Sequence, residues 1–179
     1  MAHIISVRGK TPKIGKNCFI AETATIIGDV VIGDGCSIWY GAVVRGDVNS
    51  ITIGDNTNIQ DNAVIHGTYE KYATRIGSGV SVGHSAIVHG ATIEDNSLIG
   101  MGATVLDNSV VEEDTVIAAG AVLSGGKRAE RGGVYAGIPA KRIKELTSED
   151  CERIIRTTAE HYQMYTTWYA AEEEKEHDN

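Results

Sequence analysis

Aliphatic residues recur at every sixth position along most of this chain, and this spacing restricts the fold more than any other feature. The series has eighteen positions between residues 14 and 123, with short insertions after the sixth and ninth and one hexad shortened by a residue. The positions are Ile14, Ile20, Ile26, Ile32, Ile38, Val44, Ile53, Ile59, Ile65, Ile76, Val82, Val88, Ile93, Ile99, Val105, Val111, Ile117 and Leu123. Four residues after most of them stands a small side chain, as at Ala24, Ala63 and Ala103.

This period excludes an α-helix, because six residues make about 1.7 helical turns and the apolar positions would move around the axis. A β-sandwich would place turn residues every 8–12 positions, not every six. A triangular coil of three hexads satisfies the pattern, with the aliphatic residue inside and the small residue at a crowded corner. Segments such as Gly54-Asp55-Asn56 supply the corners. The sequence therefore predicts an all-β fold, a parallel β-helix of about six triangular coils.

The six-residue repeat fades after Leu123, and a glycine-rich loop is expected over residues 132–139. The segment Thr147-Ser148-Glu149-Asp150 is typical of a capping box, and it predicts a helix from about Ser148 to Tyr169 that packs on the β-helix. We therefore expect a β-helix domain with an N-terminal cap and a C-terminal loop over residues 1–146. The helix and an acidic tail occupy residues 147–179.

Composition and charge restrict the partners that this chain would bind. The formal net charge is −8 for 179 residues, and the tail from Glu172 to Asp178 contributes half of it. We therefore expect no basic surface that would bind nucleic acid. No apolar run is long enough for a membrane span, and no signal peptide is expected at the start. Three cysteines without a paired framework favour a reducing compartment, the cytoplasm.

The repeat also fixes where three of the six histidines point. His66 and His89 each follow an interior aliphatic residue by one position and lie one coil apart, so they stack at about 4.8 Å on one face. That spacing suits two ligands of one metal ion. His84 follows Val82 by two positions and belongs to the neighbouring face. It would reach the same metal only across an interface, as in a trimer of three-faced subunits.

The same arithmetic places three further polar residues near these histidines. Arg45 shares the column of His66 and His89, and Asp47 is the carboxylate that stands closest to it in the sequence. Gln60 lies on the face of His84, one coil earlier. An unpaired amide at an interface is costly, so Gln60 is expected to hold water or substrate or to orient a neighbour.

Three segments around these residues carry a resemblance to a known family. They are Val43-Val44-Arg45-Gly46-Asp47, Asn58-Ile59-Gln60-Asp61-Asn62, and Val82-Gly83-His84 through His89-Gly90. In order and spacing they resemble the motifs of gamma-class carbonic anhydrases, a family of the hexapeptide-repeat superfamily. The resemblance extends over residues 11–124 and the C-terminal helix. It implies a left-handed β-helix and a homotrimer with metal sites at the subunit interfaces.

The resemblance implies that His66 and His89 from one subunit and His84 from its neighbour bind one metal ion. Zinc is expected, with iron and cobalt as alternatives because imidazole suits all three. The activity implied is the reversible hydration of CO₂ to bicarbonate by a metal-bound hydroxide, because such a metal lowers the pKa of bound water to about 7.

The resemblance also assigns roles to the neighbouring polar residues. Arg45 and Asp47 are implied to pair across the trimer interface. Gln60 is implied to lie beside the metal-bound water, with support from Asn58 and Asp61.

Two departures from the family pattern lower the activity that we expect. Prototypical members carry a glutamate where this chain has Val48, and a longer acidic loop where it has only residues 67–74, with Glu70 as the one candidate to carry protons. The chain is similar to a shorter subgroup in which a tyrosine of the C-terminal helix reaches the pocket. Tyr162 is the nearest match, although packing is the competing role for it. Turnover limited by proton export is expected.

Other functions on the same scaffold remain open. Residues 137–143 resemble the segment that follows the β-helix of acyltransferases that use acetyl-CoA, although that segment recurs across the superfamily. Such an enzyme needs one histidine as general base and has no evident use for a stacked pair. A metal-bound thioesterase and a non-catalytic trimeric scaffold are further alternatives.

Overall fold

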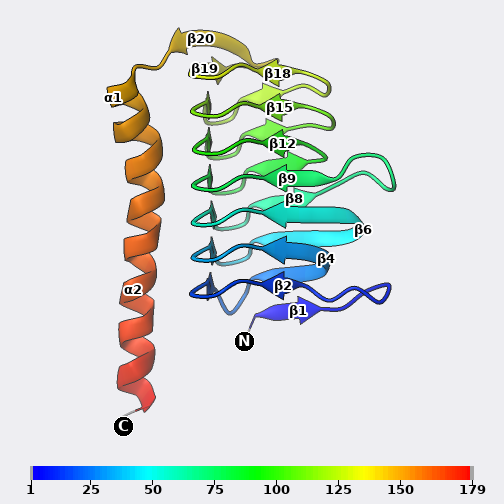
Figure 1. The fold of residues 1–179 in the computed structure, drawn as a ribbon, viewed down its shortest axis with the longest axis vertical. Coiled ribbons are helices and arrows are strands. Elements are labelled where there is room, and N and C mark those ends of the chain that lie inside the picture. Colours follow the sequence, from blue (N-terminus) through cyan, green and yellow to red (C-terminus); the bar gives the residue numbers. More distant parts are fainter. Residues whose placement is uncertain (1, 178–179) are drawn as a thin grey trace.

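A computed structural model describes residues 2–177, with side chains through residue 169. The strands wind into a parallel β-solenoid of about seven turns, and a single long helix runs along its side (Figure 1). One sheet contains β3 (Phe19–Ile20), β5 (Ser37–Ile38), β7 (Asn58–Ile59), β10 (Ser81–Val82), β13 (Leu98–Ile99), β16 (Val116–Ile117), β19 (Gly133–Ala136) and β20 (Lys141–Glu145). The fold class expected from the period of six is confirmed.

The second sheet covers the other two faces, because its two longest strands continue around a corner. These are β4 (Thr25–Ile32) and β6 (Val43–Ile53). On one side of them lie β1 (His3–Ile5), β8 (Val64–His66), β11 (Ile87–His89), β14 (Thr104–Val105) and β17 (Val122–Leu123). On the other side lie β2 (Lys13–Ile14), β9 (Thr74–Ile76), β12 (Thr92–Ile93), β15 (Val110–Val111) and β18 (Arg128–Ala129).

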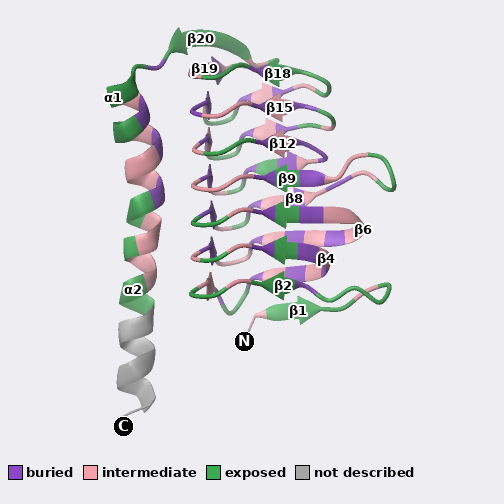
Figure 2. Ribbon diagram, viewed as in Figure 1, coloured by how far each residue is buried: buried purple, intermediate pink, exposed green. Residues whose placement is uncertain are grey.

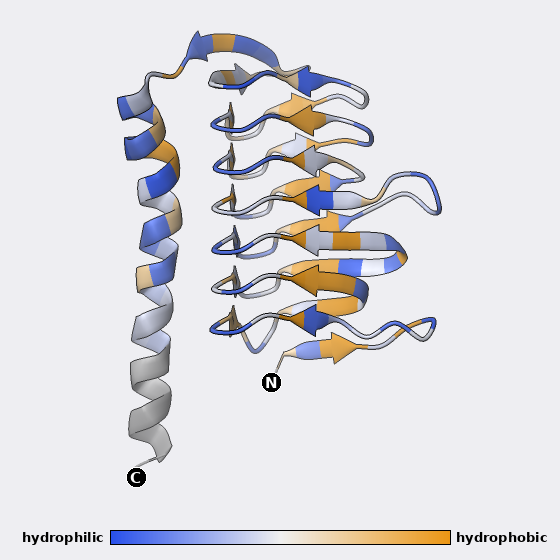
Figure 3. Cartoon of the chain, viewed as in Figure 1, coloured by the Kyte–Doolittle hydropathy of each residue, from blue (hydrophilic) through white to orange (hydrophobic). Residues whose placement is uncertain are grey.

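The register of the strands follows the hexad count. Ile99 pairs with Ile117, eighteen residues or three hexads later, and Ile59 pairs with Val82 across the five-residue insertion. Consequently each interior aliphatic residue lies over its equivalent in the next turn. Burial follows the same rule, with the strand interiors buried and the corners exposed (Figure 2), and the apolar residues concentrate on the strands (Figure 3).

The solenoid is about one turn longer than the six coils expected, and the loop expected over residues 132–139 is partly strand. Ala129 in β18 and Tyr135 in β19 pair with Val111 and Ile117 and continue the interior columns. Neither residue belongs to the Ile, Val and Leu pattern that defined the repeat. The phenol oxygen of Tyr135 accepts a hydrogen bond from the backbone N–H of Glu130 at 2.8 Å, which lets a tyrosine occupy this position while 7% exposed.

The helix begins with the expected capping box and is continuous to residue 177. Its parts are α1 (Ser148–Asp150), a π-helical turn η1 (Cys151–Arg156) and α2 (Thr157–His177). The Thr147 side chain accepts from the backbone N–H of Asp150, and the Asp150 side chain accepts from that of Thr147. The helix extends beyond the expected end at Tyr169. The side chains of the acidic tail, Glu172 to Asp178, lie outside the described ones.

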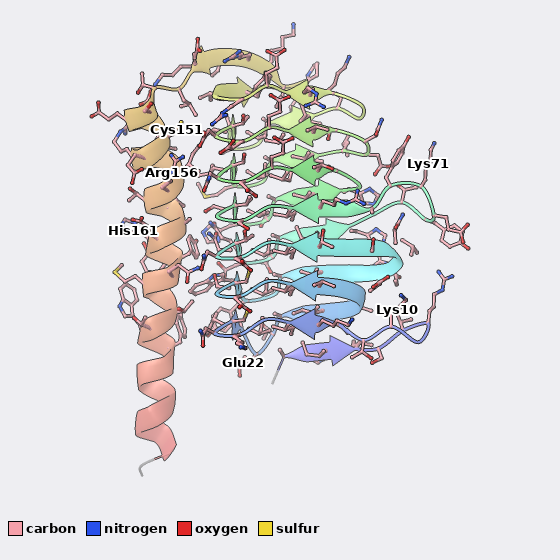
Figure 4. All side chains as sticks on the ribbon, in the orientation of Figure 1. Lys10, Glu22, Lys71, Cys151, Arg156 and His161 are labelled. Carbon is pink, nitrogen blue, oxygen red and sulfur yellow. The ribbon has the colours of Figure 1, made fainter. Side chains whose placement is uncertain are left out.

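Two apolar contacts hold this helix against the sheet that contains β5 and β16. At one end Ile155, fully buried, packs with Val116 and Leu146. Farther along, the Tyr169 ring lies 5.1 Å from that of Phe19, and the Tyr162 ring meets Trp39 at 5.3 Å. Figure 4 shows the side chains between the helix and the solenoid. Among the described helices, none is long and apolar enough to cross a membrane.

Replacing an interior aliphatic residue should be costly, because it leaves a cavity in a column that cannot collapse. We expect Ile99→Ala, at a fully buried position, to lower the free energy of unfolding by about 2–5 kcal/mol. Ile143→Ala, at a position 66% exposed, should cost less than about 1 kcal/mol. Chemical denaturation at one protein concentration compares the two variants, and similar losses would contradict the buried column.

Candidate metal centre

Two histidines lie over one another on adjacent turns, as the hexad count predicts. His66 ends β8 and His89 ends β11, and the two residues are paired in register. Their ring centroids are 5.1 Å apart, and His66 Nδ1 lies 3.1 Å from His89 Nε2. One nitrogen of each ring therefore points at the other ring, on the outer surface of the solenoid.

A carboxylate holds the other nitrogen of each ring. His66 Nε2 lies 3.1 Å from Asp47 Oδ1, and His89 Nδ1 lies 2.6 Å from Asp107 Oδ1. Partial burial opposes ionisation of Asp47, but hydrogen bonds from Arg45 and His66 outweigh it and hold its pKa below the usual value. Partial burial likewise opposes ionisation of Asp107, but hydrogen bonds from Thr68 and His89 outweigh it and lower its pKa. Both carboxylates therefore stay ionised and orient the two rings.

His84 lies on the neighbouring face, just after β10, and has a carboxylate partner of its own. Its Nδ1 lies 2.7 Å from Asp61 Oδ2, and its Nε2 lies 3.2 Å from the Tyr162 hydroxyl. Within the described part of one chain, no three His, Cys, Asp or Glu side chains gather into a group that could hold a metal ion. The structure thus brings His66 and His89 together and keeps His84 apart from them.

Gln60 and Asn58 form a buried chain of amides beside His84. Gln60 Nε2 donates to Asn58 Oδ1 at 3.0 Å, and Asn58 Nδ2 donates to Ser81 Oγ at 2.8 Å. Gln60 Oε1 accepts from the backbone N–H of His84 at 3.2 Å. These contacts fix which way the Gln60 amide faces. The Asn58 amide contacts Gln60, whereas the Asp61 carboxylate contacts the ring of His84.

Arg45 and Asp47 pair within the chain. Arg45 Nη1 donates to Asp47 Oδ2 at 2.6 Å, because both residues lie on β6 and alternate residues of a strand point to the same side. The two carboxylate oxygens of Asp47 thus join Arg45 and His66 in one line within the subunit. The pair between subunits that the resemblance implies stays a prediction.

Tyr162 combines packing with a polar contact. Its ring lies edge-on to Trp39, while its hydroxyl faces His84. Burial raises the pKa of this phenol to about 12, so it remains a neutral hydrogen-bonding group near neutral pH. A cavity of about 360 Å³ lies beside these groups, and Leu98, Met101 and Val116 form part of its wall.

Asp107 is the residue that the sequence did not indicate. It lies two positions after the interior residue Val105, one turn beyond His89, and no motif includes it. The signal that could have found it is the hexad count, because Leu106 continues the column of His66 and His89 and the next residue in the chain is this aspartate.

The donor set fits a metal ion. Two ligands of a tetrahedral ion with bonds of about 2.0–2.1 Å lie about 3.3 Å apart, close to the 3.1 Å between His66 Nδ1 and His89 Nε2. Carboxylates on the far nitrogens are the usual companions of metal-binding histidines. His84, with Nδ1 on Asp61, would offer Nε2 in the same way once that nitrogen gives up its contact with the Tyr162 hydroxyl.

The chain is similar to known proteins over most of its length. Residues 11–46 and 90–125 match the family profile "Bacterial transferase hexapeptide (six repeats)". The chain is 39% identical to "Carbonic anhydrase" of Geobacillus kaustophilus, an alignment that covers 90% of each protein. It is 43% identical to "Probable carbonic anhydrase" of Methanocaldococcus jannaschii over 79% of this chain and 88% of that protein. The chain belongs to the gamma-class carbonic anhydrase family of hexapeptide-repeat proteins.

The chain spans less than two thirds of the length of some of its relatives. "Gamma carbonic anhydrase 2, mitochondrial" of Arabidopsis thaliana is 43% identical over 96% of this chain, which covers 63% of the plant protein.

Among solved structures, the "hexapeptide transferase family protein" of Anaplasma phagocytophilum is 42% identical with a TM-score of 0.88, covering 93% of this chain and 98% of that one. A "putative acetyltransferase" of Bacillus cereus is 40% identical with a TM-score of 0.86, covering 93% and 98%.

Removing the middle of the amide chain should cost more than removing its end. Asn58→Ala leaves Gln60 Nε2 and Ser81 Oγ without their partner in a buried position, so we expect a loss of about 1–3 kcal/mol in the free energy of unfolding. Ser81→Ala leaves one buried group, Asn58 Nδ2, without its acceptor, so the loss should be about half as large. Equal losses in chemical denaturation would contradict the place of Asn58 in the middle of this chain of amides.

Proposed function

We propose that this protein is a metal-dependent carbonic anhydrase-like enzyme that interconverts CO₂ and bicarbonate as a homotrimer. The observation that carries the proposal is the pair of nitrogens of His66 and His89, 3.1 Å apart, with the far nitrogen of each ring held by a carboxylate. Relatives at 39–44% identity that are named carbonic anhydrases support the substrate.

The positions of the three proposed ligands support an assembly of more than one subunit, for which we propose a trimer. His84 lies on a different face from His66 and His89, so a site with three imidazoles needs a second subunit. Apolar side chains flank the histidine pair on the outer surface, since Ile87 is 38% exposed and Leu106 37% exposed. Exposed aliphatic residues beside a half-built polar site favour a subunit packed there.

His66 Nδ1, His89 Nε2 and the His84 Nε2 of a neighbouring subunit would hold the metal, with zinc proposed and iron or cobalt as alternatives. When bound, an ion of this kind supplies a water molecule acidic enough to react at neutral pH. Asp47, Asp61 and Asp107 keep the three rings in the tautomer that offers these nitrogens.

The remaining polar groups bind and orient the substrate. Gln60 has one N–H left after its bond to Asn58, and this donor is available to a substrate oxygen beside His84. Tyr162 remains protonated near neutral pH and offers a second neutral hydroxyl there. Arg45 forms an ion pair with Asp47. Without Arg45, His66 would be the one side chain, among those described, in contact with this negative charge.

Slow turnover is part of the proposal. Val48 supplies no acid, and among the described contacts the Glu70 carboxylate makes no hydrogen bond or ion pair with either histidine.

Reduced, unpaired Cys18, Cys36 and Cys151 support the cytoplasm as the compartment.

Stopped-flow CO₂ hydration tests the reaction. The metal-loaded protein should accelerate hydration, and His89→Ala should abolish the acceleration while the circular dichroism spectrum is kept. Acetyl-CoA consumption with amine acceptors, measured in the same samples, tests the acyltransferase alternative. Metal-loaded protein that leaves the hydration rate unchanged would overturn the proposed reaction.

Mixing two defective subunits tests the shared site. Neither His84→Ala nor the double variant His66→Ala, His89→Ala should bind metal alone. When the two are co-expressed in equal amounts, about three quarters of random trimers are mixed, and each mixed trimer regains one intact site of its three. Metal analysis should therefore give about a quarter of the wild-type content. A mixture that stays metal-free would show that the ligands are not divided between subunits in this way.

A further inference from the structure

The insertion at residues 67–74 is attached to the histidine pair at both of its ends. It projects from the solenoid between β8 and β9, on the side away from the helix (Figure 1), with Lys71 in its outer part (Figure 4). It replaces one simple corner between the interior residues Ile65 and Ile76. A longer connection at this place either serves as a mobile loop or supplies side-chain contacts that a simple corner cannot make.

Thr68, at the start of the insertion, contacts the Asp107 carboxylate, which in turn contacts His89. Its hydroxyl donates to Asp107 Oδ2 at 2.6 Å, while Asp107 Oδ1 lies 2.6 Å from His89 Nδ1. Thr68 is itself fixed, because its backbone N–H donates to the Tyr72 carbonyl at 3.0 Å and its carbonyl accepts from Asn49 Nδ2 at 3.1 Å. Both oxygens of Asp107 are therefore occupied, and the carboxylate cannot turn away from His89.

Thr74 at the end of the insertion joins the two histidine turns through the backbone. It is fully buried, its hydroxyl donates to the His66 carbonyl, and it accepts from the Gly90 N–H at 3.0 Å. Gly90 has φ +57°, and a Cβ there would stand 2.2 Å from Asp107 Oδ1. Only glycine at this position lets Asp107 reach His89.

We propose that Thr68 is a positioning residue for the metal centre, acting through Asp107 on His89. The inference rests on the proposed metal site. With Nδ1–H donated to an anchored carboxylate, His89 is kept in the tautomer and ring orientation that present Nε2 beside His66 Nδ1. The short insertion is thus a support for a ligand, which is a different task from carrying protons.

Metal affinity of the apoprotein tests this role with three variants at the insertion and one at Asp107. Thr68→Val keeps the shape and removes the hydroxyl, Thr68→Ser restores it, and Tyr69→Phe changes an exposed residue of the same insertion. Zinc affinity is measured by competition with a chromophoric chelator, and the visible spectrum is recorded with cobalt(II).

We expect Asp107→Asn to weaken zinc binding about 10–100-fold and Thr68→Val about tenfold. Thr68→Ser and Tyr69→Phe should stay close to wild type, and the cobalt spectrum should change in Thr68→Val but not in Thr68→Ser. Folded Thr68→Val and Asp107→Asn proteins with wild-type affinity and spectra would overturn the positioning role. Wild-type protein that binds neither ion would overturn the metal site itself, so the two failures are distinguishable.

Discussion

Parallel pairing of each turn of the solenoid with the next is the constraint on which the rest of the structure depends. It places residues three hexads apart directly over one another, so a side chain is always stacked on its equivalent. Inside, this gives continuous columns that consist mainly of aliphatic residues. Outside, it sets His66 over His89. Two imidazole nitrogens at about the spacing of two ligands of one tetrahedral ion are therefore a direct consequence of the backbone register.

Stacking brings the imidazole rings together, and the carboxylates fix which ring nitrogens face one another. Asp47 and Asp107 each take the outer nitrogen of one stacked ring, and Asp61 takes Nδ1 of His84. Each aspartate comes from a different part of the fold, on β6, after β7 and after β14. The rigid solenoid holds these distant segments at hydrogen-bonding distance, and the helix adds Tyr162 from the far end of the chain.

Much of this arrangement follows from the sequence, because a period of six determines both the fold and the direction of each side chain. The stacking of His66 on His89 and the sharing of a face by Gln60 and His84 were both predicted by counting hexads. The last turn was missed because Tyr135 fills an interior position where the pattern required an aliphatic residue. The anchoring of Asp107 by Thr68 depends on how an insertion folds back, and hexad counting stops at insertions.

The central claim is that two stacked histidines of one subunit and His84 of another hold one metal ion. Anomalous X-ray scattering from crystals of the metal-loaded protein tests it most directly. The account predicts one peak per chain between His66 Nδ1 and His89 Nε2, within about 2.0–2.1 Å of both, with the neighbouring subunit's His84 as third ligand. A peak elsewhere, or a metal held by one chain alone, would contradict it.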